Sequence, residues 1–233
     1  METWLEWARG PFFWAALTFM FLGLARHVLV TIWEVVRNTR RAGDRRLPYR
    51  QIAAATLAWL YPPGKLKDRL VFGLTSLVFH IAILLVPIFL AGHIALWERS
   101  VGISWPAIPN LLADILTVVA VVTGMLLVLQ RAIARDTRSL SRFQDYALPL
   151  LVAFPFAWGF LVMHPAWNPF PYELTLLIHV MSANVLLILI PLTKLSHCVL
   201  LPGTQMVSEV AWHWPPDAGR KVGIALGKEG EPV

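Results

Sequence analysis

Hydrophobic residues along this chain are gathered into long blocks that are separated by shorter polar connections. Each block is about twenty residues long, the length that an α-helix needs to cross a bilayer core of about 30 Å. Five such blocks occur, at about residues 12–33, 70–97, 108–130, 146–163 and 174–199. The pattern predicts an all-α integral membrane protein. Residues 1–203 would form a five-helix transmembrane bundle, and residues 204–233 would form a C-terminal tail.

Basic residues are distributed unevenly over the connections between these blocks. The connection 37–69 holds nine Lys and Arg residues, and the connection 131–142 holds four. The turn after the second block holds only Arg99, and residues 164–173 hold none. Because Lys and Arg favour the cytoplasmic side of a membrane, we expect the N-terminus outside and the C-terminal tail in the cytoplasm. The predicted location is the cytoplasmic (inner) membrane of a bacterium or archaeon.

Composition agrees with a membrane protein and excludes some kinds of redox site. The chain is 57% hydrophobic and 15% charged, whereas soluble domains have about 25% charged residues. The net charge of +6 is explained by the basic residues of the predicted cytoplasmic connections, so we expect no nucleic-acid partner. A single cysteine, Cys198, excludes an internal disulfide and a cluster held by several cysteines. The chain therefore has no iron–sulfur site of its own.

Four of the seven histidines lie inside two of the predicted spans. His80 and His93 belong to the second span, and His179 and His197 belong to the fifth. An ionisable side chain within a membrane usually faces the bundle interior and marks a functional site. On a continuous helix, His179 and His197 would share one face about 27 Å apart, and His80 and His93 would be about 20 Å apart along the axis.

The second and fifth spans run in opposite directions, which brings the four histidines level in two pairs. His93 comes level with His179 on the predicted outer side, and His80 comes level with His197 on the inner side. Neutral imidazole is a good axial ligand for haem iron, and two such ligands can hold one b-type haem. We therefore predict two haem b groups, with the axial pairs His93/His179 (outer) and His80/His197 (inner).

Prolines and small residues accompany these histidines. Pro87 and Pro191 lie between the paired histidines, and each predicts a kink that would reconcile the unequal spacings. Small residues near the outer histidines would let a flat macrocycle approach the backbone: Ala91, Gly92, Ser182 and Ala183.

Two other interpretations of the histidines stay open. They could pack or relay protons in a haem-free membrane anchor or transport subunit, although no inverted repeat of the kind common in transporters is visible. They could also bind a metal ion. That interpretation is weaker, because each level has only two histidines and no carboxylate except Asp114.

The motifs "FH…GH" in the second span and "IH…PLTKLSHCVLLP" in the fifth carry a family resemblance. Over about residues 10–203 the chain resembles the gamma subunit of respiratory nitrate reductases and its relatives. The relatives include cytochrome b subunits of sulfite-reductase-associated, heterodisulfide-reductase-like and some hydrogenase complexes. The resemblance implies two bis-histidine b haems with the same ligand pairs, and electron exchange with menaquinone or ubiquinone. The second-span spacing is about one turn longer than in nitrate reductase subunits, which favours the relatives.

The resemblance also implies an electron-transfer subunit whose substrate site lies on another chain. That partner would be an iron–sulfur or other redox subunit, docking at residues 37–69 and the C-terminal tail. Within 37–69, "PYRQIAAATLAWLYPPG" predicts a short amphipathic helix that rests on the membrane surface or on the partner. Since quinol oxidation needs a proton acceptor, we expect a quinone contact or proton path at His164, Asp114 and Arg99. His164 could equally be an interfacial histidine that faces water.

Overall fold

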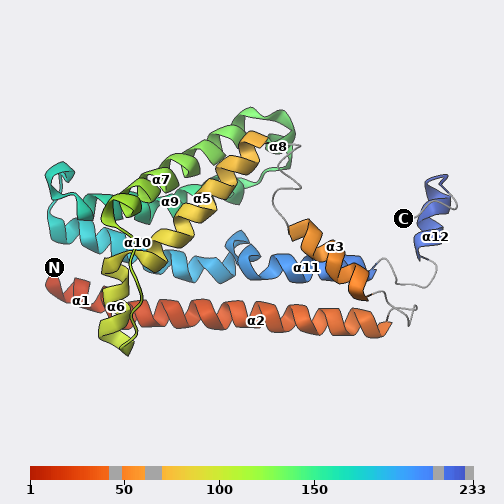
Figure 1. Cartoon of the computed structure of the whole chain (residues 1–233), viewed down its shortest axis with the longest axis horizontal. Helices are drawn as coiled ribbons and strands as arrows, with labels where there is room; N and C mark the ends of the chain where they lie inside the picture. The colour runs from red at the N-terminus through yellow and green to blue at the C-terminus, as the bar shows by residue number, and fades with distance from the viewer. Residues whose placement is uncertain (42–48, 61–69, 212–217, 229–233) are drawn as a thin grey trace. The chain divides into compact units, whose positions relative to one another are not determined.

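The computed structural model describes residues 1–41, 49–60, 70–211 and 218–228. These residues are helical apart from short connections, and no strand occurs among them. The elements, shown in Figure 1, are α1 (Glu2–Arg9), α2 (Pro11–Arg41), α3 (Tyr49–Leu60), α5 (Leu70–Phe89), α6 (Ala91–Val101), α7 (Asn110–Ile133), α8 (Arg135–Leu140), α9 (Phe143–Met163), η1 (Pro165–Trp167), α10 (Tyr172–Leu192), η2 (Lys194–Ser196), α11 (His197–Ala211) and α12 (Ala218–Ala225).

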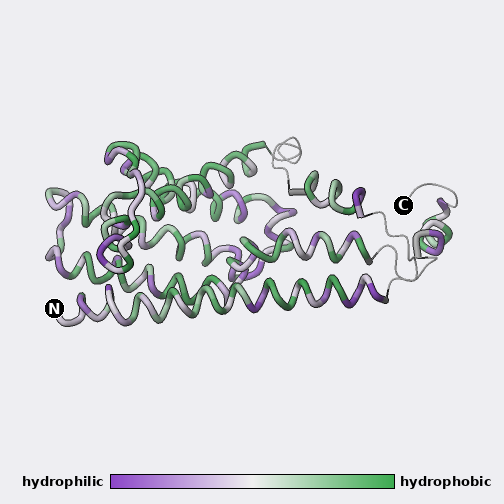
Figure 2. The backbone as a smooth tube through the Cα atoms, turned by 60° about the horizontal axis from the view of Figure 1, so that its bottom comes forward, coloured by the Kyte–Doolittle hydropathy of each residue, from purple (hydrophilic) through white to green (hydrophobic). Residues whose placement is uncertain are grey.

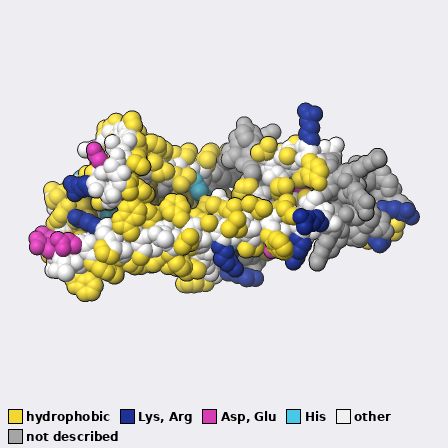
Figure 3. Space-filling view, turned by 90° about the horizontal axis from the view of Figure 1, so that it is seen from below, with side chains coloured by type: hydrophobic (Ala, Val, Ile, Leu, Met, Phe, Trp, Pro, Cys, Tyr) yellow, Lys and Arg dark blue, Asp and Glu magenta, His cyan; other side chains and the backbone are white. Residues whose placement is uncertain are grey.

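Five helical segments are long and apolar enough to cross a membrane. They are Glu2–Arg40, which joins α1 and α2, and the helices α5, α7, α9 and α10. Figure 2 shows the hydrophobic residues along them, and Figure 3 shows apolar side chains over much of one face. Only 11 to 28% of each apolar stretch is buried within the chain, as expected for helices that face lipid. The predicted all-α membrane fold with five spanning helices is confirmed, and its sidedness stays a prediction.

The chain divides into two compact units, formed by residues 1–19 with 68–189 and by residues 20–67 with 190–233. In the first unit, α7 packs against both α5 and α9. Its buried residues recur every three or four positions and are mostly small: Ala113, Thr117, Ala120, Thr123, Gly124 and Leu127. Small side chains let helix backbones approach closely within a membrane. A Cβ atom added at Gly124 would lie 3.2 Å from Ala153 Cβ and 3.2 Å from Phe79 Cε2.

Two polar side chains of the first unit donate hydrogen bonds between helices. The Asn184 side chain on α10 donates to the Ala8 carbonyl of α1 at 2.8 Å, and Asn184 is only 1% exposed. Gln130 on α7 donates to the Thr75 hydroxyl of α5 at 3.0 Å. Such bonds stabilise a bundle in lipid, where an unpaired polar group has no water to bind.

In the second unit, α3 packs against α11. Ile52 of α3 and Val210 of α11 are buried together, and Met206 packs against them. The short helix predicted within 37–69 therefore corresponds to α3. The predicted start of the tail, after residue 203, falls inside α11, which continues to Ala211 because these apolar residues cover α3.

Within the second unit, close contacts also join α2 to the end of α10 and to α11. A Cβ added at Gly23 would clash with the Pro191 ring, and one added at Gly203 would clash with Thr31 Cγ2. The ring nitrogen Nε2 of His27 donates to the Pro191 carbonyl at 2.8 Å. Glycines therefore set the spacing of the backbones here.

The second and fifth predicted spans are interrupted, which corrects our assumption of two continuous helices. Leu90 adopts an extended conformation between α5 and α6, three residues after Pro87. Thr193 is extended between α10 and η2, two residues after Pro191. Proline lacks the N–H that a helix interior requires, which weakens the ladder around it. His179 and His197 consequently lie on different helices, so the continuous helix from which we deduced a shared face is absent.

Candidate functional site

The rings of His93 and His179 lie side by side within the first unit. His93 belongs to the first turn of α6, and His179 belongs to α10. Their ring centroids are 6.0 Å apart and their planes differ by only 4°. The structure therefore brings together the two residues that were predicted to form the outer pair.

Backbone carbonyls orient both rings. Nδ1 of His93 donates to the Pro87 carbonyl at 3.1 Å, and Nδ1 of His179 donates to the Pro155 carbonyl at 2.8 Å. A carbonyl can only accept a hydrogen bond, so Nδ1 carries the hydrogen in both rings. In a neutral imidazole this leaves the lone pair on Nε2. A histidine ligand whose other nitrogen donates to a carbonyl is the usual arrangement at metal sites.

The acceptor for His93 exists because the helix is interrupted at Leu90. The interruption opens the helical hydrogen-bond ladder, and other donors reach the carbonyls just before it. The Pro87 carbonyl accepts from His93, the Ile88 carbonyl from Trp105 Nε1 at 2.8 Å, and the Phe89 carbonyl from the Ile108 N–H at 3.0 Å. Non-helical backbone at membrane depth needs such partners. The connection between α6 and α7 thus supports the segment that carries His93.

Gly159 on α9 lets the His179 ring pack directly against the helix backbone. A Cβ atom at this position would lie 2.9 Å from Cε1 and 3.1 Å from Nδ1 of His179. Pro155, whose carbonyl holds the same ring, lies one turn earlier on α9. Our sequence reasoning missed both residues. A glycine one turn after a proline inside an apolar span was the available signal.

The other two predicted ligands are also oriented by carbonyl groups. His80 on α5 donates from Nδ1 to the Ser76 carbonyl at 2.7 Å. His197, the first residue of α11, donates from Nδ1 to the Lys194 carbonyl at 2.7 Å. His80 belongs to the first unit and His197 to the second. Their pairing therefore stays a prediction.

Two of the three candidate residues for quinone or proton transfer lie in contact. Nε2 of His164, at the end of α9, is 3.5 Å from Oδ2 of Asp114 near the start of α7. Nδ1 of the same ring donates to the Phe160 carbonyl at 2.9 Å. Arg99, in contrast, is exposed in the last turn of α6. We refer to His164 and Asp114 as the His–Asp dyad.

Two aromatic rings lie beside the His164 ring of the His–Asp dyad. The His164 ring stacks on Phe160 with a centroid distance of 4.1 Å and an interplanar angle of 22°. Trp167 of η1 lies 5.8 Å from His164 and 5.9 Å from Phe160, again between ring centroids. The dyad thus combines two titratable groups with flat apolar surfaces.

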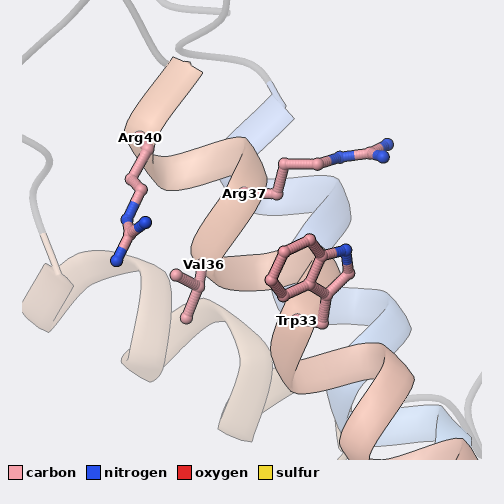
Figure 4. A pocket seen from close by; sticks show the side chains of 4 residues that line it. All are labelled: Trp33, Val36, Arg37 and Arg40. Atoms are coloured by element: carbon pink, nitrogen blue, oxygen red, sulfur yellow. The ribbon is translucent and has the colours of Figure 1, made fainter.

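A shallow pocket lies at the end of α2 (Figure 4). Trp33, Val36, Arg37 and Arg40 line it, and the two arginines extend to different sides of the helix. Tryptophan beside arginine at the end of an apolar stretch is typical of a membrane interface. Arg37 and Arg40 belong to the predicted docking segment 37–69. The remaining parts of the predicted dock are only partly described. Residues 42–48, 61–69, 212–217 and 229–233 lie outside the described residues.

Among the described residues, no group of three or more His, Cys, Asp and Glu side chains could hold a metal ion. A structural zinc ion takes four ligands from the protein, and a catalytic one usually takes three. Haem iron differs, because the macrocycle supplies four nitrogens and the protein adds only axial ligands. A pair of neighbouring histidines without a third ligand therefore suits haem better than a bare ion.

The fold and these sites define a helical integral membrane protein with histidines held in orientation by backbone carbonyls. A curated protein of Nitratidesulfovibrio vulgaris strain Hildenborough is 34% identical to this chain over 197 residues, which are 82% of this chain and 85% of the relative. The chain belongs to the same family as that protein, whose name, "Protein", describes no activity. No family model matches the chain. No solved structure matches it either.

Proposed function

We propose that the protein is a dihaem b-type cytochrome, the membrane subunit of a multisubunit respiratory oxidoreductase. It would pass electrons between the quinone pool and a partner redox subunit. His93 and His179 would hold the outer haem, and His80 and His197 would hold the inner one. The haem iron supplies one-electron chemistry, and the chain's own task is to hold and orient it.

The arrangement of His93 and His179 is the observation that carries this proposal. Two metal–nitrogen bonds of about 2 Å, together with about 1.1 Å from each nitrogen to its ring centroid, separate the centroids by about 6 Å. The observed separation is 6.0 Å, with nearly parallel rings. Two imidazole rings that carry lone pairs on Nε2 cannot form a hydrogen bond between these two nitrogens. An iron atom between them would account for both the distance and the orientation.

Open space beside His93 supports the proposal, because a macrocycle would need it. A Cβ atom added at Gly92, next to His93, would meet no atom within 4 Å. The neighbouring Ala91 is exposed, and Ser182, on the turn after His179, is half-buried. Ser182 donates its hydroxyl hydrogen to the His179 carbonyl at 2.9 Å, which keeps this small side chain against its own helix.

The partner in this proposal is an iron–sulfur or other redox subunit on the cytoplasmic side of a bacterial or archaeal inner membrane. The exposed basic end of α2 would contribute to its dock, together with α3 and the C-terminal tail. The described residues of this region include the arginines of the pocket in Figure 4, Arg37 and Arg40. Menaquinone or ubiquinone would be the exchangeable substrate.

A reduced-minus-oxidised visible spectrum of the purified chain, with haem and protein quantified together, tests the proposal. We expect two b-type haems per chain, and one in each of the variants His93→Ala, His179→Ala and His80→Ala. His27→Ala is the matched control, because His27 Nε2 already donates to the Pro191 carbonyl. That variant should keep both haems. A folded wild-type chain made with haem available but lacking a Soret band would contradict the proposal and favour a haem-free anchor or transport subunit.

A further inference from the structure

We propose that the end of α2 binds one anionic phospholipid, whose headgroup phosphate lies in the pocket of Figure 4. Arg37 and Arg40 would bind the phosphate, and Trp33 would lie beside the headgroup. An acyl chain would follow the apolar surface of α2 back toward Leu29. The inference is independent of the proposed haem groups, because it depends only on residues of the second unit.

One face of α2 is occupied by contacts within the second unit. Nε2 of His27 donates to the Pro191 carbonyl at 2.8 Å. A Cβ atom added at Gly23 would clash with the Pro191 ring, and one added at Gly203 would clash with Thr31. Positions 23, 27 and 31 follow one another every four residues, so these contacts lie on a single side of the helix.

The opposite side of α2 carries an apolar stripe that ends in arginine. At 100° per residue, Leu29 and Val36 lie within about 20° of the direction opposite to His27. Arg40 lies within about 40° of that direction and Trp33 within about 60°. Leu29 is 67% exposed, Trp33 is 64% and Val36 is 40%. From Leu29 to Arg40 the helix rises by about 17 Å, close to half of a bilayer core of about 30 Å. The stripe therefore has the length of an acyl chain in one leaflet.

The pocket lies where the apolar stripe meets the arginines. Trp33, Val36, Arg37 and Arg40 line a volume of about 200 Å³, whereas a water molecule takes about 30 Å³ in the liquid. Figure 4 shows Arg37 and Arg40 extending to different sides of the helix, with Val36 between them in the sequence. A headgroup seated over Val36 would therefore have a guanidinium group on each side. Guanidinium groups bind phosphate oxygens through pairs of parallel hydrogen bonds.

The charge around the pocket suits a phosphate. Arg37 and Arg40 are exposed, and within the described part of the chain neither guanidinium is engaged in a hydrogen bond or an ion pair. Glu34 is the only acidic residue of α2. It lies within about 20° of the direction of His27, and therefore on the other side of the helix. An anion at the pocket would consequently meet two positive charges and no carboxylate of α2.

A lipid accounts for both parts of this surface better than a free anion or a soluble protein does. Inorganic phosphate would leave the apolar stripe uncovered. A soluble subunit would meet the arginines but not the stripe, which lies within the spanning segment Glu2–Arg40. This end of α2 is predicted to be cytoplasmic, and the cytoplasmic leaflet is the anionic one. A partner that docks here would then meet the lipid headgroup together with the arginines.

Native mass spectrometry of the purified full chain in detergent tests the site, with dioleoyl phosphatidylglycerol and dioleoyl phosphatidylcholine as probes. We expect the wild type to bind one phosphatidylglycerol molecule more tightly than any phosphatidylcholine. In Arg37→Gln/Arg40→Gln the affinity for phosphatidylglycerol should fall about thirtyfold, because each basic residue near an anionic surface contributes about fivefold. Arg37→Lys/Arg40→Lys keeps the charge but not the planar fork. Its affinity should lie between those of the wild type and the glutamine variant.

Arg135→Gln/Arg138→Gln on α8 is the matched control. It removes two exposed arginines with the same spacing in a helix that has no tryptophan, and it should bind phosphatidylglycerol as the wild type does. An affinity within about twofold of wild type in Arg37→Gln/Arg40→Gln would overturn the inference. Equal wild-type affinities for the two lipids would do the same. So would displacement of the lipid by an equal concentration of inorganic phosphate, since the hydrocarbon would then contribute nothing. A glutamine variant that keeps the lipid but loses a co-purified subunit would assign the arginines to a protein dock instead.

Discussion

Replacing Gly159 by alanine places one methyl group against the ring of the predicted outer ligand. The added Cβ would lie 2.9 Å from His179 Cε1, whereas carbon atoms in ordinary contact are at least about 3.5 Å apart. The ring or the helix must therefore move by at least about 0.6 Å. That movement also disturbs the 2.8 Å hydrogen bond from Nδ1 to the Pro155 carbonyl.

Overpacking of this size costs about 1–3 kcal/mol. If the cost falls on the oriented ligand, haem affinity at the outer site decreases by about fivefold to 150-fold, since 1.4 kcal/mol corresponds to a factor of ten. Titrating the purified Gly159→Ala chain with haem, and recording the absorbance of each reduced haem, measures the affinity directly. The inner haem should bind as in the wild type.

Gly124→Ala is the matched control for this experiment. Its Cβ would also be tight, at 3.2 Å from Ala153 Cβ, and its three nearest atoms belong to Ala153, Phe79 and Pro149 rather than to a histidine. We expect this variant to lower the midpoint of thermal unfolding while keeping two haems per folded chain. An outer haem that binds Gly159→Ala with unchanged affinity would refute our account of how His179 is held.

Three further changes test other contacts. Trp105→Phe removes the 2.8 Å hydrogen bond to the Ile88 carbonyl, which should cost about 1 kcal/mol. It should also shift the reduction potential of the proposed outer haem in a redox titration. An unchanged potential would show that the connection between α6 and α7 does not influence the site. Asn184→Leu loses the buried hydrogen bond to the Ala8 carbonyl of α1. Thermal unfolding should therefore show that the free energy of unfolding decreases by about 1–2 kcal/mol. Gly203→Ala clashes with the Thr31 methyl group. The second substitution Thr31→Ser should restore the lost stability, and a double variant as unstable as the single one would contradict this packing.

The membrane fold follows from the sequence because a bilayer admits few alternatives. An apolar block of about twenty residues must satisfy its backbone internally, and a helix does so. The positions of the interruptions were harder to predict. Pro87 and Pro191 indicated weak points, yet the extended residues are Leu90 and Thr193. The first interruption depends on donors from Trp105 and Ile108, which lie beyond it in the chain.

The candidate site was predicted only in part, because residues that are distant in the sequence contribute to it as well. Antiparallel spans bring His93 level with His179, and this simple geometry holds although the second span is two helices. The contribution of α9 could not be read from spacing within the second and fifth spans. Gly159 and Pro155 act on His179 through a tertiary contact. Their role emerges only once the fourth predicted span is placed beside the fifth.

The dependence of His179 on α9 has a consequence for how the protein is made. His93 and the Pro87 carbonyl that orients it are close in the sequence and are translated together. This part of the site therefore forms early. His179 needs both α9 and α10, the last two of the described helices that are long and apolar enough to cross a membrane. Ribosome-bound chains that stop before Tyr172 should therefore be unable to retain the proposed outer haem. Cofactor capture at this site would be an event of late biogenesis, after the final helix has entered the bilayer.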